Sequence, residues 1–243
     1  MQEKLLCNPQ KLNDIEYNYR TIEENISRCA MSVGKKREDI IFLSATKTVD
    51  VAYINYAISL GLSYIGENKV QELLSKYDNY NLEHCSLQFI GHMQSNKIRQ
   101  IVDKVDMVQS IDSVKLMQEL SRQSKKQGKT TDILLEVNIG KEESKSGIFP
   151  ERLEELCYEA SQIENIRVRG LMTIPPICED SQKISAYFSA MYNLFVDMKG
   201  KNMDNIDMTY LSMGMSSDYE EAIKCGANMV RIGSSLFGAR VYR

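Results

Sequence analysis

The stretch IIFLSATKTVD, residues 40–50, places the amine of Lys47 after an apolar run, two small residues and Thr46. Residues 40–43 are apolar and partly β-branched, which is typical of a buried strand. Side chains alternate along a strand, so Leu43 and Lys47 lie on one face. If Leu43 points into a barrel, Lys47 points into the barrel mouth. The alternative is that Lys47 lies in a solvated loop, as most lysines do.

Length and composition limit the class of protein. The chain has 243 residues and 43% hydrophobic content, enough for one sizeable core, so we expect a single domain over residues 1–243. A net charge of -3, with both signs interspersed, disfavours nucleic-acid and membrane partners. Six scattered cysteines without C-x-x-C, and only two histidines, predict no metal site and reduced thiols. With no signal peptide and no long apolar run, we expect a cytoplasmic protein.

Strand-like and helix-like patterns alternate along the whole chain. We expect strands at 40–45, 62–65, 87–90, 107–111, 133–137, 166–172, 208–211 and 228–232. Helical patterns cover 10–33, 50–60, 67–77, a segment from about 96, 113–127, 150–163, 180–200 and 217–225. This pattern predicts a (β/α)₈ barrel with an extra N-terminal helix, because a doubly wound sheet would use fewer strands. The apolar stripes of 10–33 and 180–200 are more typical of core-facing helices than of partner-binding surfaces.

Small and hydroxyl-bearing residues follow the last two predicted strands. Residues 211–221 read LSMGMSSDYEE, and residues 230–240 read VRIGSSLFGAR. In (β/α)₈ barrels these two loops frequently bind phosphate, since small residues leave backbone N–H groups open to an anion. The alternative is that the glycines only make turns.

Arg231 lies between Val230 and Ile232 in the eighth predicted strand, so it faces the opposite way. If those two residues pack against the outer helices, Arg231 enters the barrel. A guanidinium there needs an acceptor, either an acidic side chain or a pyridine nitrogen. An inward lysine, a phosphate-binding pair of loops and an inward arginine together indicate a pyridoxal 5′-phosphate (PLP) site.

Six segments resemble the pyridoxal-phosphate homeostasis protein family (YggS/PROSC-like proteins) over nearly the whole chain. They are LSATKT (43–48), GLSYIGENKVQE (61–72), FIGHMQSNK (89–97), EVNIGKEESKSGI (136–148), GLMTIPP (170–176) and LSMGMSSDYEEAIKCGANMVRIGSSLFGAR (211–240). The resemblance implies a (β/α)₈ barrel related to the N-terminal domain of alanine racemase. Several segments in the same order make the match specific.

The resemblance also implies roles for single residues. Lys47 matches the lysine that forms the covalent aldimine, Arg231 the arginine at the pyridine nitrogen, and Asn68 a residue near the cofactor. The phosphate-binding residues that it implies are Ser212, Gly214, Ser216, Gly233 and Ser234. Departures from the family pattern are Thr46 for a common serine, Ser234 for a common threonine, and Leu87 and Gln88 for an aromatic residue and a histidine. The last two are expected to alter the rim of the site.

Two functions of different classes remain open. The resemblance implies a PLP-binding protein of vitamin B6 homeostasis, which holds PLP as a Schiff base and buffers it or supplies it to PLP-requiring apoenzymes. The alternative is an amino-acid racemase, which needs a base on each face of the substrate. Lys47 supplies one base; in alanine racemases the opposing tyrosine comes from a C-terminal β-domain, whereas this chain ends at Arg243. We therefore expect a carrier with at most weak side activity.

Overall fold

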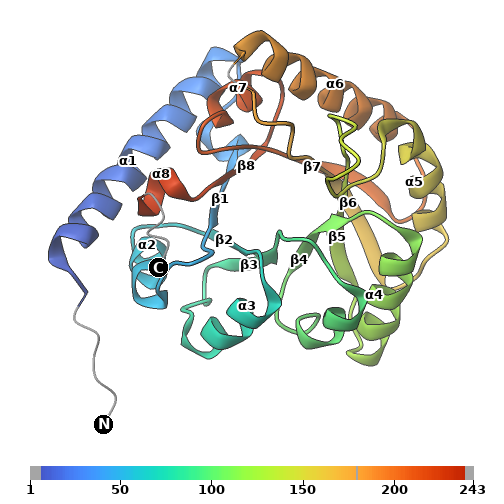
Figure 1. Ribbon diagram of the computed structural model, residues 1–243, viewed down its shortest axis with the longest axis horizontal. Coiled ribbons are helices and arrows are strands. Elements are labelled where there is room, and N and C mark those ends of the chain that lie inside the picture. The colour runs from blue at the N-terminus through green and yellow to red at the C-terminus, as the bar shows by residue number, and fades with distance from the viewer. Residues whose placement is uncertain (1–6, 179, 239–243) are drawn as a thin grey trace.

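The computed structural model describes residues 7–178 and 180–238, and its strands form a closed parallel barrel in the order β1 to β8 (Figure 1). This confirms the predicted (β/α)₈ class. All eight expected strands are present, although their ends shift by a few residues. Their bounds are β1 (Ile41–Ala45), β2 (Tyr64–Glu67), β3 (Ser86–Phe89), β4 (Met107–Ile111), β5 (Thr131–Glu136), β6 (Ile166–Met172), β7 (Ile206–Met215) and β8 (Met229–Ile232).

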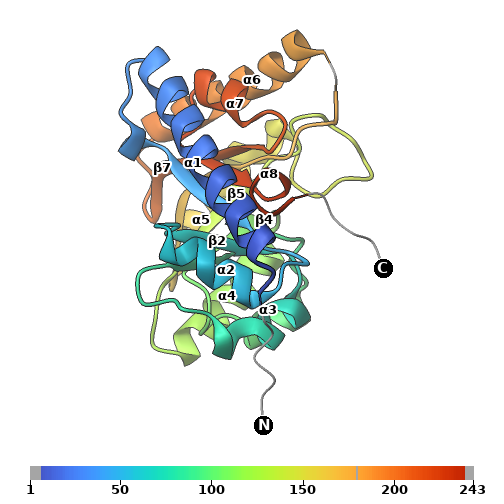
Figure 2. The ribbon, with the colours of Figure 1, turned by 90° about the vertical axis from the view of Figure 1, so that its left-hand side faces the viewer.

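Helices surround the barrel on the outside, as Figures 1 and 2 show. The α-helices are α1 (Pro9–Ser32), α2 (Val51–Ser59), α3 (Val70–Lys76), α4 (Val114–Lys126), α5 (Leu153–Ser161), α6 (Ser181–Gly200), α7 (Tyr219–Lys224) and α8 (Ser234–Phe237). Short 3₁₀ helices are η1 (Arg37–Asp39), η2 (Tyr77–Asn79), η3 (Ser95–Gln100) and η4 (Pro150–Arg152). None of the helices in the described ranges has the length and apolar character that crossing a membrane requires.

The long first helix packs against the C-terminal elements. Asn8 caps α1 by accepting a hydrogen bond from the backbone N–H of Gln10, and Pro9 begins the helix. The apolar stripe of α1 is buried, and the helix contacts α2, α7 and α8. The stripe of α6 is buried as well, so the prediction that both helices face the core is confirmed.

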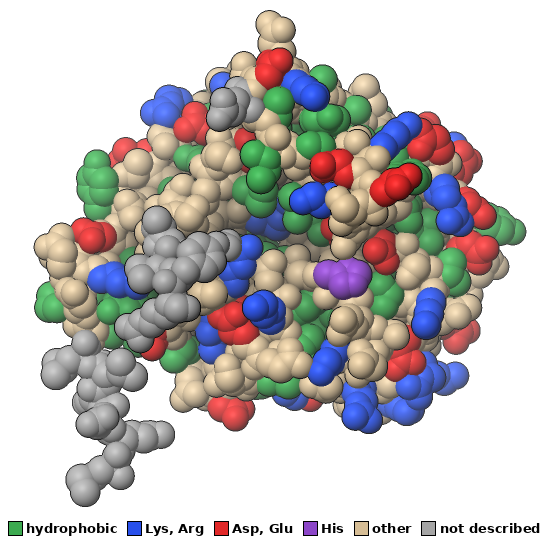
Figure 3. Space-filling model, in the orientation of Figure 1, with side chains coloured by type: hydrophobic (Ala, Val, Ile, Leu, Met, Phe, Trp, Pro, Cys, Tyr) green, Lys and Arg blue, Asp and Glu red, His purple; other side chains and the backbone are tan. Residues whose placement is uncertain are grey.

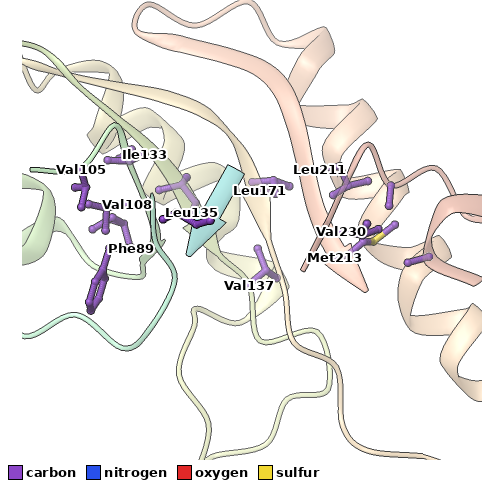
Figure 4. Packing of buried hydrophobic residues seen from close by; sticks show 14 of the residues in the cluster. Phe89, Val105, Val108, Ile133, Leu135, Val137, Leu171, Leu211, Met213 and Val230 are labelled. Atoms are coloured by element: carbon purple, nitrogen blue, oxygen red, sulfur yellow. The ribbon is translucent and has the colours of Figure 1, made fainter. Parts of the chain in front are cut away.

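The core has two layers, one outside and one inside the barrel. Outside, strand residues such as Val108, Leu135 and Val230 pack between the strands and the helices (Figure 4). Inside, Leu43 of β1 and Met229 of β8 belong to a separate cluster, which includes Tyr64 and Tyr210 from β2 and β7. Side chains of non-neighbouring strands meet only in the barrel interior. The predicted inward direction of Leu43 is therefore confirmed.

Two local expectations differ from the structure. The segment expected as a helix from about 96 is the 3₁₀ helix η3, with i to i+3 bonds such as Lys97 N–H to the Gln94 carbonyl. Strand β7 runs on to Met215 because its end still pairs with β8, Met215 opposite Arg231. Ser212 and Gly214 are therefore strand residues and not part of a loop.

Candidate functional site

The turn that carries Lys47 begins directly after β1. Lys47 is half-buried, and Thr48 has a φ of 63°. A β-branched residue in this left-handed region is strained. The face shown in Figure 3 is hollowed near its centre, and Lys and Arg side chains border the hollow. Lys47 thus lies in the turn that follows β1, the strand whose Leu43 side chain lies in the barrel interior.

Arg231 lies inside the barrel, as its alternation with Val230 and Ile232 predicted. It is only 4% exposed, whereas Val230 packs in the outer layer. One terminal nitrogen donates to Ser212 Oγ at 2.6 Å, and the other donates to the Thr173 carbonyl at 2.8 Å. Burial lowers the Arg231 pKa to about 10, although Glu136 and Asp218 oppose the shift. The guanidinium is therefore still a cation at neutral pH.

A chain of polar side chains continues from Arg231 across the barrel. Ser212 Oγ donates to Gln109 Oε1 at 2.7 Å, and Gln109 Nε2 donates to Gln88 Oε1 at 2.6 Å. Gln88 is 2% exposed, and Leu87 packs in the outer layer. The expectation that Leu87 and Gln88 alter the rim is therefore wrong: Gln88 supports the buried polar chain. Gln88, between Leu87 and Phe89, and Gln109, next to Val108, are the sequence signal for it.

The ends of β7 and β8 meet at Ser216. Its Oγ accepts hydrogen bonds from the backbone N–H groups of Gly233 at 3.2 Å and Ser235 at 3.3 Å. Two backbone donors thus converge on one oxygen, at distances longer than the usual 2.9–3.0 Å of such bonds. An anionic oxygen is a stronger acceptor than a hydroxyl, so this arrangement fits a phosphate.

The glycines of these segments have packing reasons of their own. Gly214 has a φ of 91°, and a Cβ there would lie 2.5 Å from the Ala222 Cβ on α7. A Cβ on Gly233 would lie 2.8 Å from the Ala45 carbonyl oxygen at the end of β1. Ser234, which begins α8, is exposed. Gly233 therefore brings the β8 end close to the strand that leads to Lys47.

Asn68 follows β2 and contains a buried acceptor. Among the described residues, its Oδ1 atom has no hydrogen-bond partner. A buried polar atom without a partner is unfavourable, so a bound group with an O–H or N–H donor would satisfy it. The residues at the barrel mouth therefore fit a ligand that has a phosphate at one end and hydrogen-bonding groups on its ring.

Sequence reasoning missed Glu136, the last residue of β5. Glu136 is only 7% exposed, and burial together with the neighbouring Asp112 carboxylate raises its pKa to about 7. The Arg231 cation acts in the opposite direction. The sequence signal for this residue was a carboxylate at the C-terminal end of a predicted barrel strand, where functional residues of such barrels lie. Glu136 therefore sets part of the charge around Arg231.

Glu136→Gln is expected to remove a pH dependence of stability in the cofactor-free protein. The folded chain retains the Glu136 proton up to about pH 7, whereas the ordinary pKa is 4.5. The wild type is thus destabilised as pH rises through this window. A pKa shift of one unit corresponds to about 1.4 kcal/mol. The amount by which Glu136→Gln raises the free energy of unfolding should therefore increase by about 2–3 kcal/mol between pH 5 and pH 8. Urea unfolding of the wild type and the variant at both pH values measures this difference in stability. A difference that does not change with pH would contradict the raised pKa of Glu136.

Comparisons with known proteins agree on one family. The model of the alanine racemase N-terminal domain matches residues 11–241. The pyridoxal phosphate homeostasis protein of Aquifex aeolicus is 38% identical over 90% of this chain and 95% of its own length. That of Escherichia coli K12 is 34% identical over 95% and 99%. The structure of PipY from Synechococcus elongatus with PLP bound is 29% identical, with a TM-score of 0.77 over 88% of this chain and 100% of PipY. The chain therefore belongs to the pyridoxal phosphate homeostasis proteins, within the family of the alanine racemase N-terminal domain.

Proposed function

We propose that this chain binds PLP at the barrel mouth, through a Schiff base with Lys47, and buffers the cofactor or supplies it to PLP-requiring apoenzymes in the cytoplasm. The observation that carries the proposal is the position of Arg231. It is a buried cation inside the barrel, on the strand paired with β1, and Lys47 follows β1. The relatives named for PLP homeostasis, and PipY with PLP bound, support the same ligand.

The residues at the site divide the binding among three parts of the ligand. When bound, PLP supplies an aldehyde that condenses with an amine, and a ring that withdraws electrons. Lys47 provides the amine, and the N–H groups at Gly233 and Ser235 with Ser216 bind the phosphate. Arg231 carries five N–H donors and no acceptor, and two of these donors bond to Ser212 and Thr173. The others are available to the ring nitrogen.

The charge of Arg231 favours holding the cofactor over turnover. With a pKa of about 10, Arg231 stays protonated at neutral pH. It would therefore donate a hydrogen bond to the ring nitrogen of a bound PLP without protonating it. An unprotonated ring is a weak electron sink, so removal of a proton from a bound amino acid is poorly assisted. Tyr80 is an unsuitable second base, because its phenol donates to Glu67 at 2.8 Å and burial raises its pKa.

The proposal predicts cofactor transfer without rapid turnover. Deuterium exchange at the α-carbon of alanine and other amino acids should be far slower than the median enzyme turnover of about 10 s⁻¹. The loaded protein should restore activity to a PLP-requiring apoenzyme, measured against free PLP at matched concentration. Rapid exchange with inversion would overturn the carrier function in favour of a racemase. Failure to restore the apoenzyme would contradict the supply role.

A further inference from the structure

A buried polar network lies beside the turn that carries Lys47. It consists of Thr46, Glu67, Glu72, Lys76 and Tyr80, which we call the Glu67 network. Glu67 ends β2 and is 0% exposed. Its Oε1 atom accepts hydrogen bonds from Thr46 Oγ1 at 2.7 Å, from Tyr80 OH at 2.8 Å and from Lys76 Nζ at 2.9 Å. Three donors thus converge on one buried carboxylate oxygen.

The Glu67 network holds the backbone on both sides of Lys47. Before Lys47, the Lys76 amine donates to the Thr46 carbonyl at 3.0 Å. After Lys47, the Thr48 backbone N–H donates to Glu72 Oε1 at 2.5 Å. The same Glu72 oxygen accepts from Lys76 Nζ at 2.7 Å. Lys76 therefore joins the two anchoring points that flank Lys47.

Thr48 shows why such anchors are needed. Its φ of 63° is unfavourable for a β-branched residue. Strained backbone persists only where the surrounding structure determines it, and here a carboxylate holds the Thr48 N–H group. Without Glu72 and Lys76 the turn would relax toward an ordinary conformation, and the Lys47 amine would move with it.

The composition of the network is costly for stability alone. The side chains of Glu67, Lys76 and Glu72 are only 0%, 12% and 19% exposed. Burying ion pairs contributes little net stability, and well-packed apolar residues often replace them without loss. If the network only stabilised the fold, apolar residues could take the place of the two carboxylates and the amine. Their bonds on either side of Lys47 indicate a geometric role.

We infer that Glu67, Glu72 and Lys76 are positioning residues, which fix the Lys47 turn so that the amine meets the PLP aldehyde. The inference rests on the proposed Schiff base at Lys47. It separates two parts of binding: the Glu67 network controls the covalent bond, whereas the phosphate is held by the ends of β7 and β8 on the other side of β1.

Lys76→Met removes the amine that joins the two anchors and keeps the length of the side chain. A misplacement of about 1 Å can reduce a rate on the order of 100-fold, so the rate of borohydride-fixable adduct formation should fall at least about tenfold. Non-covalent affinity for PLP, measured in Lys47→Ala with and without Lys76→Met, should change less than about twofold. In the cofactor-free protein, hydrogen exchange of the Thr48 amide should accelerate.

Three further substitutions separate positioning from stability. Thr46→Val removes the hydroxyl and keeps the side-chain shape, so the adduct rate should fall; Thr46→Ser keeps the hydroxyl and should restore most of it. Lys129→Met is the matched control, because Lys129 Nζ also binds backbone carbonyls, those of Val102 and Val105 at 3.0 and 3.2 Å, ahead of β4. It should leave the adduct rate and the visible absorption band of the adduct unchanged.

The outcomes distinguish this inference from the proposed function. If wild-type protein forms no borohydride-fixed adduct on Lys47, the proposed Schiff base fails. If the wild type forms it and folded Lys76→Met and Thr46→Val form it at the wild-type rate, only the positioning role is overturned. If Lys129→Met slows adduct formation as much as Lys76→Met does, the effect is one of general stability, and the inference is also overturned. If Lys76→Met does not fold, the adduct rates of Thr46→Val and Thr46→Ser test the positioning role in its place.

Discussion

Lys47→Ala is expected to abolish the covalent adduct that borohydride fixes after PLP is added. The amine at the end of β1 is the group that condenses with the aldehyde in the proposed site, and alanine has no nucleophile. Non-covalent binding should persist in weakened form, because the backbone N–H groups of Gly233 and Ser235 are independent of Lys47. Peptide mapping of the reduced protein and equilibrium dialysis measure the two kinds of binding separately.

Lys69 and Lys97 provide matched controls for Lys47. Both line a cavity of about 170 Å³ together with Asn68 and His92. Their amines therefore lie near the proposed cofactor residue Asn68, but they do not come from the turn after β1 that carries Lys47. Lys69→Ala and Lys97→Ala should retain the adduct at full stoichiometry. An adduct mapped to either lysine in the wild type would refute the assignment of Lys47.

Gly91→Ala is expected to destabilise the fold and to displace Asn68. A Cβ on Gly91 would lie 2.0 Å from the Asn68 carbonyl oxygen and 2.6 Å from its carbonyl carbon and Cα. Backbone atoms cannot rotate away as a side chain can, so the segment after β2 must move. Overpacking typically costs about 1–3 kcal/mol, and a clash with backbone belongs at or above the upper end, about 3 kcal/mol. Affinity for PLP should fall as well, because Asn68 moves.

Gly200→Ala is the control for that substitution. Gly200 ends α6, and apart from its chain neighbours and the nearby backbone of the helix itself, no heavy atom of the described residues lies within 4 Å of the position its Cβ would take. Alanine is favoured over glycine in a helix by up to about 1 kcal/mol, so Gly200→Ala should be neutral or stabilising. Urea unfolding of both variants tests the comparison. Equal stability of Gly91→Ala and wild type would show that the segment after β2 adapts without cost.

The fold could be predicted from the sequence because its signals are local. The strand-like runs alternate with helical patterns along the chain, and most strands contain neighbouring apolar residues. Alternation along a strand depends only on neighbouring residues, so the inward direction of Leu43 and Arg231 followed once the barrel was assumed. The extent of β7 was not predictable in this way, because its pairing with β8 decides where it ends.

Within the candidate site, the sequence determined the kinds of groups and the ends of the strands on which they lie. The tertiary structure alone decided their partners. Glu67 meets Thr46 and Tyr80, which lie 21 and 13 residues away. Glu136 owes its raised pKa first to burial in the closed barrel and then to Asp112 of a neighbouring loop. Gln88 looked like a rim residue, but the barrel buries it against Gln109. Hydrogen bonds and charge interactions act over a few ångströms of space, and closure of the barrel brings together residues whose separation along the chain carries no such information.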